Sequence, residues 1–190
     1  LFEKDVQQAI FGIYGFVRFA DEIVDTFHDY DKERLLTSFE SDLKEAIEQK
    51  ISMNPVLHAF QLVIHQYKIP YELIDAFMRS MKADLYKQVY QTKEETEQYI
   101  YGSANVVGLM CLKVFTKGDE EAYNHLKEPA MKLGSAFQKI NFLRDLNTDI
   151  NDLQRQYFNN YIQTEFNEDA KCAIINEIKQ EFHLALQGIK

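Results

Sequence analysis

Hydrophobic residues recur every three or four positions along most of the chain, and no segment alternates convincingly between apolar and polar side chains. The first pattern is typical of amphipathic α-helices, and the second would indicate half-buried strands. No repeat, low-complexity tract or linker divides the 190 residues. The pattern therefore predicts one all-α domain over residues 1–190. Its expected helices span 3–27, 31–50, 55–67, 70–86, 92–115, a stretch that ends at 150 and bends or restarts at Pro129, and 167–188.

Two of the predicted helix starts carry strong local signals. Asn54 followed by Pro55 combines an N-cap side chain with a proline at the first helical position. Thr92 and Glu95 have the spacing of a capping box, in which each side chain accepts a hydrogen bond from the other residue's backbone N–H. We therefore expect helices to begin at these two points.

The first helix carries charged side chains on one face of an otherwise apolar segment. In YGFVRFADEIVDTF, residues 14–27, the side chains of Tyr14, Arg18, Asp21 and Asp25 follow one another at i, i+4, i+7 and i+11 and form one stripe. A helix that is apolar nearly all round is expected inside a protein. A carboxylate there must be paired, hydrogen-bonded or bound to metal. The stripe therefore predicts that the two aspartates bind something.

A second stripe repeats this arrangement more than a hundred residues later. In AFQKINFLRDLNTDI, residues 136–150, four polar side chains stand at i, i+3, i+7 and i+11, with an arginine beside them. They are Gln138, Asn141, Asp145 and Asp149, and the arginine is Arg144. If the two stripes face each other in a bundle, four carboxylates converge at one end of a cavity.

Converging carboxylates repel one another, and a hard cation, Mg²⁺ above all, relieves that repulsion through oxygen ligands. Arginines beside such a site suit bidentate contact with a diphosphate. A di-iron bundle would instead need Glu-x-x-His pairs, and neither stripe contains a histidine. The alternative is that each stripe makes ordinary surface ion pairs between residues three or four positions apart.

The amino-acid composition limits which partners the protein is expected to bind and in which compartment it is expected to lie. The formal net charge of −9 argues against nucleic acid as a partner, because phosphate binding needs a basic surface. Cys111 and Cys172 give no disulfide framework and no metal-ligand spacing, which fits a reducing compartment. No apolar run reaches the ~20 residues of a membrane span, and no signal peptide is visible. We expect a cytoplasmic location, with or without peripheral association with a membrane.

In this order, the two motifs resemble those of the squalene/phytoene synthase family, the head-to-head trans-isoprenyl diphosphate synthases, and most of all its bacterial phytoene synthases. The first match is Y-x-x-x-R-x-x-D-x-x-x-D at 14–25, and the second is Q-x-x-N-x-x-R-D-x-x-x-D at 138–149. MKADL (81–85), YIYGSANVVG (99–108) and RQYF (155–158) resemble further family segments, the last displaced by one residue. Asn105 stands where glycine is common in the family.

The resemblance implies an isoprenoid synthase helical bundle around a central cavity, incomplete at both ends in this chain. It implies Mg²⁺-dependent condensation of two prenyl diphosphates through a cyclopropyl diphosphate intermediate, with two geranylgeranyl diphosphates giving phytoene and diphosphate being released. The alternatives are a farnesyl diphosphate-using squalene or dehydrosqualene synthase and a non-catalytic assembly factor on the same fold. Peripheral membrane contact would serve product release, and the sequence leaves the oligomeric state open.

The resemblance also implies roles for individual residues. Asp21, Asp25, Asn141 and Asp145 become metal ligands, and Asp149 becomes a ligand or a neighbouring carboxylate, so that the four aspartates form the catalytic set. Contact with diphosphate or intermediate is implied for Tyr14, Arg18, Gln138, Arg144 and Tyr157.

Two further expectations concern the prenyl chain. Phe11 lies on the first stripe, about 15 Å of helix axis from Asp21, and so is expected to form a floor under the prenyl tail; the alternative is an ordinary core phenylalanine. The small side chains at 102–104 and at Gly108 predict either a thin wall beside the prenyl chain or close helix packing.

Overall fold

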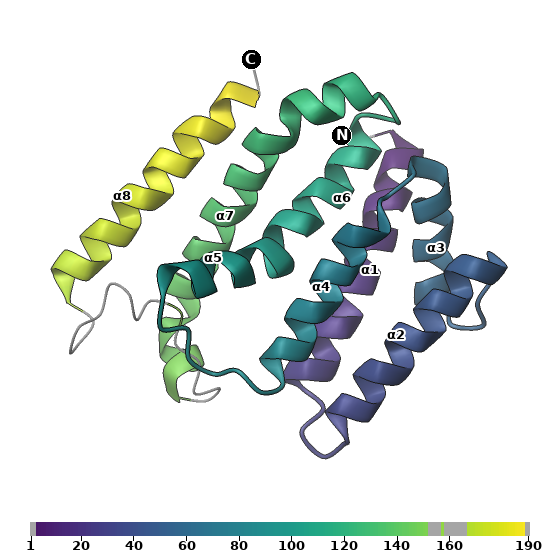
Figure 1. Cartoon of the computed structure of the whole chain (residues 1–190), viewed down its shortest axis with the longest axis horizontal. Coiled ribbons are helices and arrows are strands. Elements are labelled where there is room, and N and C mark those ends of the chain that lie inside the picture. Colours follow the sequence, from purple (N-terminus) through teal and green to yellow (C-terminus); the bar gives the residue numbers. More distant parts are fainter. Residues whose placement is uncertain (1–2, 152–156, 158–166, 189–190) are drawn as a thin grey trace.

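The computed structural model describes residues 3–151, 157 and 167–188, and the side chains of residues 147–151 lie outside that description. Within these residues the chain forms helices and no β-strand, which confirms the all-α prediction. The elements, coloured along the chain in Figure 1, are α1 (Lys4–Asp25), α2 (Lys32–Gln49), α3 (Pro55–Tyr67), α4 (Tyr71–Asp84), α5 (Lys93–Ile100), the π-helix η1 (Tyr101–Asn105), α6 (Val106–Phe115), α7 (Glu120–Asn151), α8 (Glu168–Ala185) and the short 3-10 helix η2 (Leu186–Gly188).

Both predicted helix starts are confirmed by their hydrogen bonds. The Asn54 side chain accepts from the backbone N–H groups of Val56 and Leu57 at the start of α3. Thr92 and Glu95 form the complete capping box at the start of α5. The local sequence therefore sets where these helices begin, before any packing is considered.

Two helical stretches differ in detail from the sequence-based expectation. The helix expected over 92–115 is continuous but contains the π-helical segment η1, a form that is common at functional sites. α7 runs through Pro129 as one helix, so the chain does not restart there. Figure 1 shows the first turns of α7 inclined to the rest, as expected when a proline removes a hydrogen bond from the helix interior.

The larger hydrophobic core surrounds α1, which packs against α2, α3, α4 and α6. Phe16 is completely buried, its ring stacks on Phe60 with 4.1 Å between centroids, and Phe77 lies at 5.3 Å. Burying one such side chain contributes about 1.5–3 kcal/mol to folding. Apolar packing therefore contributes strongly to holding this helix in position.

A second, smaller core joins α5, α7 and α8, and much of it is tyrosine. It contains Tyr90, Tyr99, Ile100, Ala136, Phe142, Tyr157, Ile174 and Ile178. Because buried tyrosines carry hydroxyl groups that need partners, this core is tied to polar groups in a way that the first is not.

In the described part of the chain, no helix combines the length and the apolar character that crossing a bilayer requires.

Candidate active site

The two polar stripes line one cavity of about 500 Å³ between α1, α4, α5 and α7. The structure therefore brings together residues separated by more than a hundred positions in the sequence, as the matched spacing suggested. The sequence-predicted residues among its lining are Tyr14, Arg18, Asp21, Asp25, Gln138, Asn141, Arg144, Asp145 and Tyr157.

The stripe on α1 faces an open cavity and not a sealed interior. The ring of Tyr14 is 63% exposed, and Arg18 forms ion pairs with Asp21 at 2.8 Å and Glu22 at 2.6 Å. The expectation of a helix buried all round is therefore wrong for this face, although Phe16 and Ile13 on the opposite face are fully buried. A half-open polar face allows charged ligands to reach the aspartates.

The stripe on α7 carries a matching pair of opposite charges. The guanidinium of Arg144 donates two hydrogen bonds to the Asp145 carboxylate, from Nε at 2.8 Å and from Nη2 at 2.5 Å. These bonds hold the pKa of Asp145 below its ordinary value and raise the pKa of Arg144. One turn earlier, the amide of Asn141 donates to Gln138 Oε1 at 3.3 Å. Asp145 is therefore kept as a carboxylate that can bind a cation.

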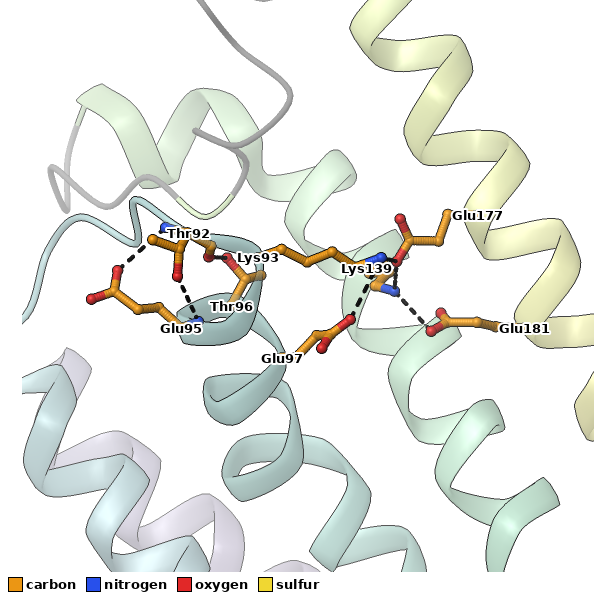
Figure 2. A network of polar contacts seen from close by, with 8 residues as sticks. All are labelled: Thr92, Lys93, Glu95, Thr96, Glu97, Lys139, Glu177 and Glu181. Carbon is orange, nitrogen blue, oxygen red and sulfur yellow. Dashed lines mark hydrogen bonds and ion pairs between the residues drawn. The ribbon is translucent and has the colours of Figure 1, made fainter.

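A buried ion-pair network holds the opposite side of α7. Figure 2 shows Lys139 pointing toward α8, where its Nζ donates to Glu177 at 2.5 Å and to Glu181 at 2.8 Å. Lys93 of α5 lies 3.9 Å from the same Glu177 carboxylate. Lys139 is only 5% exposed and follows Gln138 directly in the sequence. The network therefore ties three helices together behind the second stripe.

The lining residues that were not singled out as site residues from the sequence include Asp84, Tyr99 and Phe142. Asp84 is 9% exposed and accepts a hydrogen bond from the Tyr99 hydroxyl at 2.8 Å. Burial and then the charge of Asp84 raise the pKa of Tyr99 well above its usual value, so the hydroxyl keeps its proton. Phe142 stacks on Tyr157 with 3.9 Å between centroids and 5° between ring planes. The sequence did point to two of them, because Asp84 and Tyr99 lie in MKADL and YIYGSANVVG, the two segments that resemble family segments.

Two residues expected at the site are not placed there. Phe11 is 62% exposed on α1 and does not line the cavity, because its position one turn before Tyr14 carries it past the cavity edge. The described residues therefore give no support to a floor at Phe11. The side chain of Asp149 lies outside the described residues.

The small residues of η1 and α6 divide between the two expected roles. A Cβ atom on Gly102 would lie 2.7 Å from the Cβ of Ser80, so this glycine serves close helix packing. Gly108, by contrast, lines a second, apolar cavity. Asn105 packs against Gly134 and accepts a hydrogen bond from the Ser135 hydroxyl at 3.1 Å. Asn105 thus occupies the space that is open because Gly134 has no side chain.

The charges around the cavity suit a cation and an anion bound together. Its lining holds four carboxylates, Asp21, Asp25, Asp84 and Asp145, and two guanidinium groups, Arg18 and Arg144. Among the side chains that the structure describes, no three histidine, cysteine or acidic groups converge closely enough to form a metal cluster. The donors are nevertheless hard oxygens on two facing helices, the type that Mg²⁺ takes in ones and twos while its other ligands come from water and phosphate.

Comparison with other proteins gives one consistent result. A sequence model of the family described as squalene/phytoene synthase matches residues 1–171. A 4,4'-diapophytoene synthase from Staphylococcus haemolyticus is 27% identical over 181 residues, which are 92% of this chain and 59% of that protein. A 15-cis-phytoene synthase from Enterobacter agglomerans is 27% identical over 159 residues, which are 78% of this chain and 52% of that protein. The chain therefore spans between half and three-fifths of the length of these relatives.

Solved structures show the same fold. A squalene synthase HpnC from Alicyclobacillus acidocaldarius aligns with a TM-score of 0.81 at 20% identity. The alignment covers 96% of this chain and 73% of the HpnC chain. A dehydrosqualene synthase in complex with ligand aligns with a TM-score of 0.79 at 24% identity. This alignment covers 98% of this chain and 67% of the dehydrosqualene synthase chain. Both alignments cover nearly the whole of this chain. With the family model matching residues 1–171, this chain belongs to the squalene/phytoene synthase family.

Proposed function

We propose that this chain carries the ionisation centre of an enzyme that condenses two prenyl diphosphates head to head. The favoured reaction joins two geranylgeranyl diphosphates into phytoene through a cyclopropyl diphosphate intermediate, with release of diphosphate. The observation that carries the proposal is the convergence of the Tyr14-to-Asp25 and Gln138-to-Asp145 stripes on one cavity. The alternative substrate is farnesyl diphosphate, since similar proteins include both a diapophytoene synthase and phytoene synthases.

The donor set supports a requirement for Mg²⁺. Asp21, Asp25, Asn141 and Asp145 would hold the ion through oxygen atoms, with Asp149 as a fifth candidate. When bound, Mg²⁺ would supply positive charge to the leaving diphosphate and so favour ionisation of the allylic C–O bond.

The diphosphate itself would be bound by the polar residues beside the aspartates. Arg18 and Arg144 both have exposed side chains and already make short ion pairs, so each can exchange a carboxylate for phosphate oxygens without a change of position. Tyr14 and Gln138 line the same part of the cavity and offer further hydrogen bonds. These side chains would orient the leaving group.

A second cavity fits the hydrocarbon part of the substrate. It has a volume of about 410 Å³, runs along α6 and α7, and is lined almost entirely by apolar groups, among them Gly108, Leu133 and Phe137. It shares no lining residue with the polar cavity, although Phe137 directly precedes Gln138 on α7. We propose it as the site for the prenyl tail because, unlike exposed Phe11 on α1, its lining offers an apolar surface.

The aromatic wall formed by Tyr99, Phe142 and Tyr157 suits the carbocation that ionisation leaves behind. Its rings line the polar cavity and are each less than a tenth exposed. Such a wall excludes water, which would quench the cation, and presents π faces that attract it.

The direct test is to supply farnesyl and geranylgeranyl diphosphate separately, with and without Mg²⁺, and to measure diphosphate release and hydrocarbon products. We expect Mg²⁺-dependent release and a product built from two geranylgeranyl units. A product from farnesyl units alone would assign the alternative substrate. Tight binding of either diphosphate without any release would instead indicate a non-catalytic factor on the same fold.

A further inference from the structure

Asp84 belongs to neither aspartate stripe, yet it lies at the same cavity. It is the last residue of α4, where the partial negative charge of the helix end disfavours a carboxylate. Only 9% of Asp84 is exposed to solvent, and burying a carboxylate costs free energy. Both effects oppose an aspartate at this position, so its presence needs an explanation that packing does not give.

The explanation lies in two tyrosine hydroxyls. Tyr99 donates to one Asp84 oxygen at 2.8 Å, and Tyr90 donates to the other at 3.3 Å. The two rings lie 4.8 Å apart and come from different segments, Tyr90 from the loop before α5 and Tyr99 from α5 itself. We call Asp84, Tyr90 and Tyr99 the aspartate–tyrosine anchor. One carboxylate thus fixes two aromatic rings.

The anchor extends to the rings that face the substrate. Tyr157 lies 5.3 Å from Tyr90 and 5.2 Å from Tyr99, and stacks in turn on Phe142 of α7. Its backbone carbonyl accepts a hydrogen bond from the buried Thr96 hydroxyl at 2.9 Å. The four rings therefore form one cluster in mutual contact, and the carboxylate of Asp84 bonds the hydroxyls of two of them.

Resting on the proposed function, we propose that Asp84 is a positioning residue that holds the aromatic wall in place through Tyr90 and Tyr99. Its role is distinct from that of the metal-binding aspartates. Loose rings would admit water to the carbocation, whereas fixed rings keep the cation on the path to carbon–carbon bond formation. Misplacement of catalytic groups by about 1 Å can cost on the order of a hundredfold in rate.

Two variants, Tyr90→Phe and Asp84→Asn, test the anchor, and Tyr90→Phe is the more selective of them. It lines a neighbouring cavity and not the candidate active site, and its ring stays buried if only the hydroxyl is removed. Tyr90→Phe should lower kcat by about threefold to tenfold, and Asp84→Asn by about tenfold to a hundredfold. Both should raise the proportion of prenyl alcohol, the product of water capture, relative to hydrocarbon. The matched control is Tyr30→Phe, because Tyr30 is 69% exposed and far from Asp84 in the sequence.

Four measured quantities decide between this role and others: KM, the Mg²⁺ requirement, kcat and the alcohol fraction. KM for the prenyl diphosphate and the Mg²⁺ concentration for half-maximal rate should stay at wild-type values. A raised Mg²⁺ requirement in Asp84→Asn would make Asp84 a metal ligand and overturn the proposal. An unchanged kcat and alcohol fraction in both variants would overturn it as well.

A readout independent of turnover keeps this test separate from the proposed function. Near-UV circular dichroism reports rigid packing of tyrosine rings, and Asp84→Asn, which removes no tyrosine, should lose part of that signal while Tyr30→Phe nearly keeps it. An undiminished signal in Asp84→Asn would overturn the anchor, even if the enzyme is active. If the wild-type chain releases no diphosphate from either substrate, the proposed function fails, and the dichroism still decides whether Asp84 fixes the rings.

Discussion

The two helices that bear the aspartates are held in place by different kinds of interaction. α1 is held by apolar packing, with Phe16 stacked on Phe60 in the middle of the larger core. The first half of α7 packs on the same apolar core, but beside its stripe α7 is held by polar interactions, with Lys139 bonded to Glu177 and Glu181 on one side and the tyrosine-rich core on the other. Two stripes with nearly the same sequence spacing thus depend on different physical forces.

This difference predicts how each half of the site responds to change. Apolar packing is non-directional and tolerates the loss of one partner in proportion to the volume removed. A buried ion pair is directional, and removing one member leaves the other without compensation. α1 should therefore act as the firm half of the site, and α7 as the half whose position is most easily disturbed.

The largest effect should come from the aspartates themselves, and it should be equal on the two helices. Asp21→Asn and Asp145→Asn should each lower diphosphate release on the order of 1,000-fold, because a lost metal ligand removes several kcal/mol of charge stabilisation. Far-UV circular dichroism should be unchanged, and the exposed Asp42→Asn should behave as wild type. Near-normal turnover in either variant would remove that aspartate from the metal site.

Phe16→Ala should cause the largest loss of stability and test the apolar support of α1. Removing a fully buried phenylalanine costs about 3–5 kcal/mol, which chemical denaturation would measure. Phe16→Leu, which keeps most of the volume, should cost much less. The loss should not depend on salt, because no charge is involved. A strong salt dependence would contradict the proposed difference between the two helices.

Lys139→Met is the corresponding change on α7. It removes from the nearly buried Glu181 the lysine that bonds it, while Glu177 keeps Lys93 nearby, and we expect a loss of about 3 kcal/mol. Adding Glu181→Gln to this variant should recover part of the loss, since the uncompensated charge is then removed. The matched control is Lys171→Met, whose ion pair with Glu168 is exposed and should matter little. Equal behaviour of the two lysine variants would show that the network does not hold α7.

Arg144→Lys should give the smallest effect. Lysine keeps the charge but loses the planar fork that now bonds Asp145 twice. We expect inorganic diphosphate with Mg²⁺ to bind severalfold more weakly in a calorimetric titration, with the fold intact. Arg79→Lys, which changes a comparable ion pair on α4, serves as the control. Unchanged affinity would mean that Arg144 orients Asp145 and does not contact diphosphate.

Much of the site could be predicted from residue spacing, because helical periodicity is a local property. The side chains of Tyr14, Arg18, Asp21 and Asp25 share a helix face wherever that helix lies, and the same holds for Gln138, Asn141 and Asp145. The residues that sequence reasoning missed are those whose role depends on distant partners. Lys139 reads as a solvent-exposed lysine until α8 is placed beside it, and Asp84 gains its significance only from Tyr90 and Tyr99.

By itself, the sequence determined the helices, the caps at Asn54 and Thr92, and the composition of both stripes, because each depends on residues within a few positions of one another. Only the tertiary structure decided that the stripes line one cavity, that Phe11 lies outside it, and that an apolar cavity follows α6 and α7. The physical reason is that burial, ion pairing and cavity shape are properties of the space between helices. That space is set by the simultaneous packing of side chains from many distant parts of the chain.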